Sequence, residues 1–134
     1  MWANVDNEDG YEIEFSIKAV NEYFAGICQD IYVEDGSYEW GIYWDTDHIY
    51  LPSTFITDST QSYGIDLTDD FHVIKIVVVG TSIKIYVDGT ERISETLDNA
   101  TSPLNKQITW GKTPYRTTDK GGDCKYDYFR YTLN

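Results

Sequence analysis

The segment from Phe71 to Gly89 constrains the fold more than any other part of this 134-residue chain. It reads FHVIKIVVVGTSIKIYVDG, so apolar residues recur at every second position on both sides of Gly80. Two β-branched runs with this alternation, joined by a short connection containing glycine, predict an antiparallel hairpin with one apolar face. Asp88-Gly89 predicts a second hairpin turn, because both residues tolerate positive φ angles.

Alternation of period two continues through most of the chain. It predicts strands over Tyr11 to Val20, Tyr38 to Trp44 and His48 to Leu51, with a turn at Asp45-Thr46-Asp47. We also expect strands over 23–32, 90–97, 106–111 and 125–133, a turn over 34–37, and loops over 52–68 (with a short strand), 98–105 and 113–122. No window has a helical period, so we expect almost no helix. The prediction is an all-β fold with two antiparallel sheets packed face to face, and periodicity alone leaves a closed barrel open.

The composition predicts a single domain over residues 1–134 and excludes several partners. The 23 acidic and 10 basic residues give a net charge of −13, which repels nucleic acid and anionic lipid. The longest aliphatic run, Ile76 to Val79, is far shorter than the roughly 20 residues of a membrane-spanning helix. No secretory leader follows Met1, so we interpret the chain as a domain of a longer secreted, extracellular protein. Whether Cys28 and Cys124 form a disulfide is left open.

Several of these segments resemble the concanavalin A-like lectin and glucanase superfamily. The resemblance lies in Y-x-I-x-F from Tyr11, W-x-x-Y from Trp40, the central hairpin with its I-x-I-Y-V-D-G phrase, and the closing W-G and Y-D-Y-F-R-Y segments. These segments are similar in particular to the laminin-G-like and carbohydrate-binding members of the superfamily. The resemblance implies a jelly-roll sandwich rather than a barrel, and it suggests a structural hydrogen bond for His72.

Catalytic motifs are weak in this chain. Sandwich glucanases of the superfamily carry E-x-D-x-x-E on one strand, and that pattern is absent. Glu12 and Glu14 share a strand face without a third acid, and we interpret them as solvated. Glu34-Asp35 and Glu39 lie near a turn with the wrong spacing. Whether the chain is an enzyme is therefore uncertain, and the absent motif favours a protein that is not.

A structural calcium ion is the cofactor that the resemblance implies. Y-D-Y-F-R-Y is similar to the ending of laminarinase-type glucanases, where the aspartate supports calcium, and Asp127 matches that position. By strand phase Asp127 shares a face with Phe129 and Tyr131, and a carboxylate facing an apolar interior requires a cation or strong donors. An edge aspartate bonded to backbone N–H groups is the alternative. Asp45-x-Asp47 is a weaker metal candidate, because such a pair is common in turns.

Aromatic residues give the strongest functional signal. The chain has 12 Tyr and 4 Trp, more than a small β core normally buries. Sugar-binding sites combine exposed aromatic rings with planar hydrogen-bonding groups. By phase, the candidate carbohydrate-binding residues that face outward are Glu39, Tyr43, His48, Tyr50, Tyr86, Tyr128 and Arg130. Outward tyrosines also occur for β-propensity alone, and Tyr115 with Arg116 is a separate loop candidate.

The sequence thus favours a non-catalytic, lectin-like domain that binds a polysaccharide by aromatic stacking. One alternative is a glycoside hydrolase or polysaccharide lyase with a non-standard site, for which His48 with Tyr43 or Tyr50 is the pair to test. The other is a protein-interaction or spacer domain of an adhesin or viral appendage.

Overall fold

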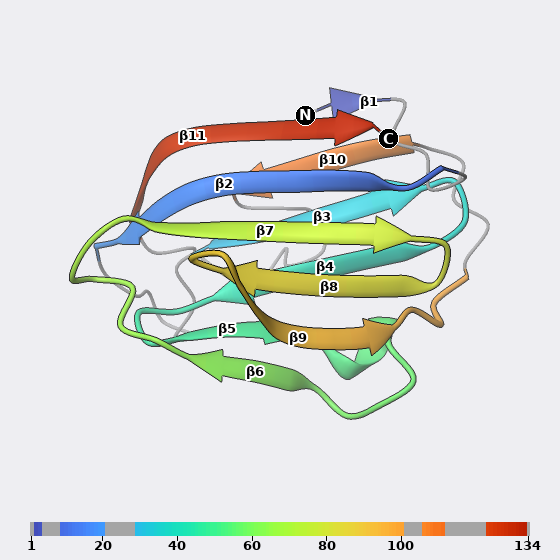
Figure 1. The fold of residues 1–134 in the computed structure, drawn as a ribbon, viewed down its shortest axis with the longest axis horizontal. Coiled ribbons are helices and arrows are strands. Elements are labelled where there is room, and N and C mark those ends of the chain that lie inside the picture. The colour runs from blue at the N-terminus through green and yellow to red at the C-terminus, as the bar shows by residue number, and fades with distance from the viewer. Residues whose placement is uncertain (1, 4–8, 21–28, 101–105, 112–122, 134) are drawn as a thin grey trace.

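The computed structural model describes residues 2–3, 9–20, 29–100, 106–111 and 123–133, and it consists of two antiparallel sheets packed face to face (Figure 1). The five-stranded sheet has, in spatial order, β11 (Cys124–Leu133), β2 (Tyr11–Ala19), β7 (His72–Val79), β8 (Ser82–Val87) and β9 (Thr90–Thr96). The six-stranded sheet has β1 (Trp2–Ala3), β10 (Lys106–Gly111), β3 (Gln29–Asp35), β4 (Glu39–Trp44), β5 (His48–Leu51) and β6 (Gln61–Gly64). The predicted all-β, two-sheet sandwich is confirmed.

The central hairpin forms as its alternation predicts. Ile74, Ile76 and Val78 of β7 are fully buried, and they lie opposite buried residues of β8. Asp88 and Gly89 have φ angles of 50° and 83°, so the second turn also forms where expected. The Asp88 carboxylate accepts a hydrogen bond from the Val73 N–H at 2.9 Å, which stabilises this turn.

Aromatic side chains connect the two sheets across the core. Phe15 of β2 stacks on Trp44 of β4 and on Phe129 of β11, each with a centroid distance of 5.4 Å. Phe129 in turn stacks on Trp110 of β10 at 4.4 Å. Full burial of a ring, as for Phe15 and Trp44, stabilises the fold by about 1.5–3 kcal/mol, and stacked pairs add about 0.5–1.5 kcal/mol.

A buried chain of hydrogen bonds also joins the sheets. The Tyr11 hydroxyl of β2 donates to Asp35 Oδ2 at 2.8 Å and accepts from Trp40 Nε1 at 2.7 Å. All three residues are fully buried. Burial and the adjacent Asp35 charge raise the pKa of Tyr11 well above its usual value, so the hydroxyl remains a donor. The other Asp35 oxygen accepts the backbone N–H groups of residues 37 and 38, which orders the turn between β3 and β4.

The β3–β4 turn is shorter than the sequence predicts. β3 continues through Glu34 and Asp35, which we had expected in the turn, because Glu34 pairs with Glu39 across the hairpin. Part of the expected 23–32 strand lies outside the described residues. In the expected loop over 52–68, the structure has β6 and a three-residue 3₁₀ helix, η1 (Ser53–Phe55). Within the described residues no helix is long and apolar enough to cross a membrane.

The predicted phase of β11 is wrong at its start. A β-bulge between Tyr126 and Tyr128 adds one residue, so Tyr126 pairs with Ile17 while Tyr128 pairs with the next residue, Ser16. One extra residue reverses the facing of everything on one side of it. Tyr126 therefore packs against the core instead of facing outward with Tyr128, and Asp127 is exposed instead of facing the interior.

Candidate carbohydrate-binding face

The structure divides the predicted sugar-binding residues between two faces. Glu39 and Tyr43 of β4 and His48 and Tyr50 of β5 face outward from the six-stranded sheet. The remaining three residues, Tyr86, Tyr128 and Arg130, face outward from the five-stranded sheet. These outer faces lie on opposite sides of the sandwich (Figure 1). The seven residues therefore do not form one continuous surface, and strand phase alone could not show this because it does not determine which sheet a strand joins.

An aromatic cluster forms on the six-stranded sheet. Tyr43 and Tyr50 are directly opposed across β4 and β5, and their rings stack with centroids 4.6 Å apart and an interplanar angle of 18°. His48, two residues before Tyr50 on the same face, stacks on Tyr50 at 5.6 Å. All three side chains are half-buried. The stack fixes the rings on a rigid pair of strands, which is the form of a preorganised sugar-stacking surface.

Asp45 fixes the turn beside this aromatic cluster. Its Oδ1 accepts the backbone N–H groups of Asp47 at 2.9 Å and His48 at 2.6 Å, and its Oδ2 accepts the Tyr50 hydroxyl at 2.8 Å. Desolvation and the hydrogen bond to Asp45 raise the pKa of Tyr50, so its hydroxyl is a proton donor at neutral pH. Asp47 Oδ1 lies 2.6 Å from His48 Nδ1, and hydrogen bonds from His48 lower the pKa of Asp47.

Asp45, Asp47 and His48 have the spacing of a metal site. One potential ligand atom from each lies within 4.8 Å of the others. Each group also has a hydrogen-bond partner that accounts for its position as ordinary turn chemistry. Asp127, the expected calcium ligand, is a single exposed carboxylate at the β11 bulge and belongs to no such group of described residues. The other ligands that the resemblance implies are backbone carbonyls near the chain start, where residues 4–8 lie outside the described residues, so calcium at Asp127 stays a prediction.

A pair of glutamates lies further along the same face. Glu34 and Glu39 are directly opposed across β3 and β4, and the Tyr32 hydroxyl lies between them, 2.5 Å from Glu39 Oε2 and 3.3 Å from Glu34 Oε1. Burial and the hydrogen bond to Glu39 strongly raise the pKa of Tyr32. The remaining oxygens accept from Asn99 Nδ2 at 2.7 Å and Gln107 Nε2 at 3.3 Å. Sequence reasoning considered both residues but set them aside for wrong spacing, because it assigned Glu34 to the turn and did not see that the two are directly opposed.

This pair does not restore the glucanase motif. The outward positions of β4 are Glu39, Gly41 and Tyr43, so the strand carries one outward carboxylate. Glu34 supplies a second from β3, and adjacent carboxylates are what a retaining glycosidase requires. Uncharged donors, however, lie within hydrogen-bond distance of all four oxygens, and the single Tyr32 proton is directed mainly to Glu39, the nearer of the two carboxylates. The arrangement holds two hydrogen-bond acceptors in fixed positions.

The outer face of the five-stranded sheet is a network of ion pairs. Glu14 accepts from the Tyr128 hydroxyl at 2.8 Å and pairs with Arg130, whose guanidinium lies 5.4 Å from the centroid of the Tyr128 ring. Lys75 pairs with Glu12 at 3.8 Å and lies 5.4 Å from the centroid of the Tyr86 ring. Glu12 and Glu14, expected to be solvated, are thus paired. A cavity of about 230 Å³ lies here, lined by Glu12, Glu14, Lys75, Arg130 and Thr132. The two predicted aromatic residues of this face, Tyr86 and Tyr128, therefore each have a cationic side chain beside the ring.

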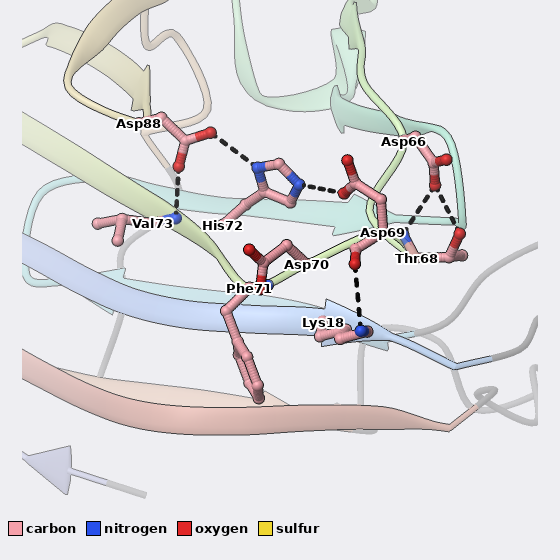
Figure 2. A network of polar contacts seen from close by, with 9 residues as sticks. All are labelled: Lys18, Asp66, Thr68, Asp69, Asp70, Phe71, His72, Val73 and Asp88. Atoms are coloured by element: carbon pink, nitrogen blue, oxygen red, sulfur yellow. Dashed lines mark hydrogen bonds and ion pairs between the residues drawn. The ribbon is translucent and has the colours of Figure 1, made fainter.

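His72 forms the structural hydrogen bond that the resemblance suggests. Figure 2 shows its ring between two carboxylates, with Nδ1 2.7 Å from Asp88 Oδ2 and Nε2 2.8 Å from Asp69 Oδ1. Desolvation lowers the pKa of His72, but the hydrogen bonds and charges of Asp88 and Asp69 outweigh it, and the pKa is raised overall. Only the protonated ring can donate to both carboxylates. Tyr115, Arg116 and Cys28 lie outside the described residues, so the loop candidate remains a prediction, while Cys124 is a free thiol in the structure.

Comparison with solved structures identifies the class of fold. The chain is similar to a doubly substituted variant of human galectin-16, with a TM-score of 0.68 at 10% identity, covering 98% of this chain and 93% of that one. It is similar to Bacillus licheniformis β-glucanase, with a TM-score of 0.62 at 18% identity and coverage of 93% and 67%. Alginate lyase A1-II′ gives a TM-score of 0.58 at 12% identity, with coverage of 98% and 65%.

These similarities define a concanavalin A-like lectin and glucanase fold, as the sequence resemblance implies. No family model and no curated protein sequence matches the chain. The same fold occurs in lectins, hydrolases and lyases, so function has to be argued from the site.

Proposed function

We propose that this chain is a non-catalytic carbohydrate-binding domain that binds a polysaccharide on the outer face of its six-stranded sheet. The stacked cluster of Tyr43, Tyr50 and His48 is the observation that carries the proposal. A sugar ring stacks its C–H face on an aromatic side chain, and fixed carboxylates beside it accept hydrogen bonds from hydroxyl groups. Asp47 and Glu39 supply such acceptors on the two sides of the cluster.

The enzymatic alternatives have less support. A uronate lyase requires a cation to neutralise the substrate carboxylate, and the described outward positions of this sheet contain no lysine or arginine. A retaining hydrolase could use Glu34 and Glu39, and release of product from a bound glycan would reveal it. A spacer domain would bind no glycan. The proposal includes an extracellular location, because a domain that binds polysaccharides would meet them outside the cell.

A glycan array on the purified domain tests the proposal, with Tyr43→Ala as the site variant. Tyr128→Ala is the matched control, because it removes a half-buried tyrosine from the opposite sheet face. We expect binding to one polysaccharide class without product release, lost in Tyr43→Ala and kept in Tyr128→Ala. Loss of a stacked ring should weaken binding by roughly 1–3 kcal/mol, or about tenfold to a hundredfold. Equal loss in both variants, or no binding by the parent domain, would contradict the proposal.

A further inference from the structure

Four carboxylates on the outer face of the six-stranded sheet, those of Glu34, Glu39, Asp45 and Asp47, have no lysine or arginine partner among the described residues. The one histidine beside them, His48, is charged only when protonated. Glu34 and Glu39 accept from tyrosine hydroxyl and side-chain amide groups, and Asp45 accepts from a tyrosine hydroxyl and backbone N–H groups. Asp47 pairs with His48. Neutral donors fix the position of a carboxylate without removing its charge. The described part of this face is therefore negatively charged.

The opposite face differs in kind. There Glu12 pairs with Lys75, Glu14 with Arg130 and Glu91 with Lys84. Lys106 is the one lysine or arginine within the described strands of the six-stranded sheet, and it aligns with Asp35, whose carboxylate is buried inside the sandwich. Among the described residues, lysine or arginine thus pairs with these glutamates on one outer face, whereas Glu34, Glu39, Asp45 and Asp47 beside the aromatic cluster have only neutral or histidine partners.

The aromatic cluster reinforces this electrostatic preference. Ring faces of tyrosine attract cations, and a desolvated ammonium group gains more from them than a neutral hydroxyl does. Glu39 and Tyr43 are four residues apart on one strand, a distance of about 13 Å, and Asp47 lies beyond the other end of the tyrosine pair. An extended oligosaccharide across the cluster would therefore meet carboxylates at both ends.

From this arrangement we infer that the glycan bound here carries free amino groups, as in a polymer of 2-amino-2-deoxy sugars, and that polyuronates are repelled. The inference rests on the proposed function and narrows its ligand class. Charge-assisted hydrogen bonds from an ammonium group to a carboxylate are about twice as strong as neutral ones, so the amino group supplies the discrimination. An N-acetyl group removes the charge and the preference with it.

The test compares hexamers of glucosamine, N-acetylglucosamine and guluronate by isothermal titration calorimetry at pH 5.5, where the sugar amine is protonated. We expect the glucosamine hexamer to bind about tenfold or more tightly than its acetylated form in low salt, and the guluronate hexamer not to bind. In 1 M NaCl the difference should largely disappear, because the Debye length falls to about 3 Å. Glu39→Gln and Asp47→Asn should each weaken glucosamine binding about threefold or more and leave N-acetylglucosamine binding unchanged.

A polycation could also be attracted by the net charge alone, and Glu91→Gln controls for this. It removes the same charge from the opposite face, where Glu91 pairs with Lys84. An equal effect of Glu91→Gln and Asp47→Asn would overturn the inference, and so would acetylated chains binding as tightly as free amines. If only uncharged glycans bind and Tyr43→Ala abolishes that binding, the inference fails while the proposed function stands. Binding of no glycan by the folded domain would overturn both.

Discussion

Replacing Tyr11 by Phe removes one oxygen atom from the core and breaks the hydrogen-bond chain that joins the two sheets. The hydroxyl donates to Asp35 at 2.8 Å and accepts from Trp40 at 2.7 Å, and all three residues are fully buried. Without it, a carboxylate oxygen and an indole N–H each lose a partner in a place that water does not reach. An unsatisfied buried group costs about 1–3 kcal/mol, and more when it is charged, so we expect a loss of roughly 3–5 kcal/mol.

Urea unfolding of Tyr11→Phe measures this cost directly. For a domain of this size the loss corresponds to a fall in Tm of roughly 10–20 °C, and the m-value should stay unchanged. Tyr128→Phe is the matched control, since its hydroxyl donates to Glu14 at 2.8 Å near solvent, and we expect it to cost less than about 1 kcal/mol. A cost for Tyr11→Phe below about 1 kcal/mol, or equal to that of Tyr128→Phe, would refute the view that this chain of hydrogen bonds holds the sheets together.

Three further predictions concern pH, packing and calcium. The pKa of His72 is raised in the folded state, so its stabilising contribution is fully present below the unfolded-state pKa of about 6.5 and is lost as the pH rises through the folded-state pKa. The pKa of Asp88 is lowered, so its contribution is lost as the pH falls through the folded-state pKa of that carboxylate. The difference in unfolding free energy between the wild type and His72→Gln should therefore shrink as the pH rises above about 6.5, and a constant difference would contradict the pairing. Gly41→Ala should lower stability by about 1–3 kcal/mol in thermal melts, because a Cβ at this position would lie 2.8 Å from the Ile31 carbonyl oxygen and 3.5 Å from the Phe55 ring. Gly64→Ala should cost less, because its Cβ would meet only the side chain of His48, at 3.4 Å. Equal losses of stability in the two variants would argue against the close approach at Gly41. If the calcium expected from the resemblance is bound through Asp127, calcium should raise the Tm of the wild type but not of Asp127→Asn, and an unchanged wild-type Tm would remove that expectation.

Strand alternation predicted the sandwich well because its signal is local. Tyr11 to Ala19 and the hairpin of β7 and β8 alternate between apolar and polar positions, as a half-buried strand must, and the structure keeps this alternation except at Ser16, which is buried. The facing of β11 could not be predicted in the same way. Its bulge at Asp127 depends on pairing with β2, more than one hundred residues away, and no local pattern marks it.

The candidate site was predicted only in part for a related reason. Alternation placed Tyr43, His48 and Tyr50 on one outer face, because a short turn joins β4 and β5 and fixes their register. It could not separate them from Tyr86, Tyr128 and Arg130, since sheet membership is decided by long-range pairing. The Glu34 and Glu39 pair became visible only when β3 was seen to extend to Asp35. Once β3 is known to extend to Asp35, alternation along it places Tyr32 and Glu34 on the outer face.

The most direct test of the central claim is a two-dimensional amide NMR titration of the ¹⁵N-labelled domain with the glycan selected by the array. We expect chemical-shift changes at β3, β4 and β5, centred on Tyr43, His48 and Tyr50, and little change at Tyr86, Tyr128 and Arg130 on the opposite face. Changes confined to the outer face of the five-stranded sheet, around Glu12, Glu14 and Arg130, would contradict the proposed binding face.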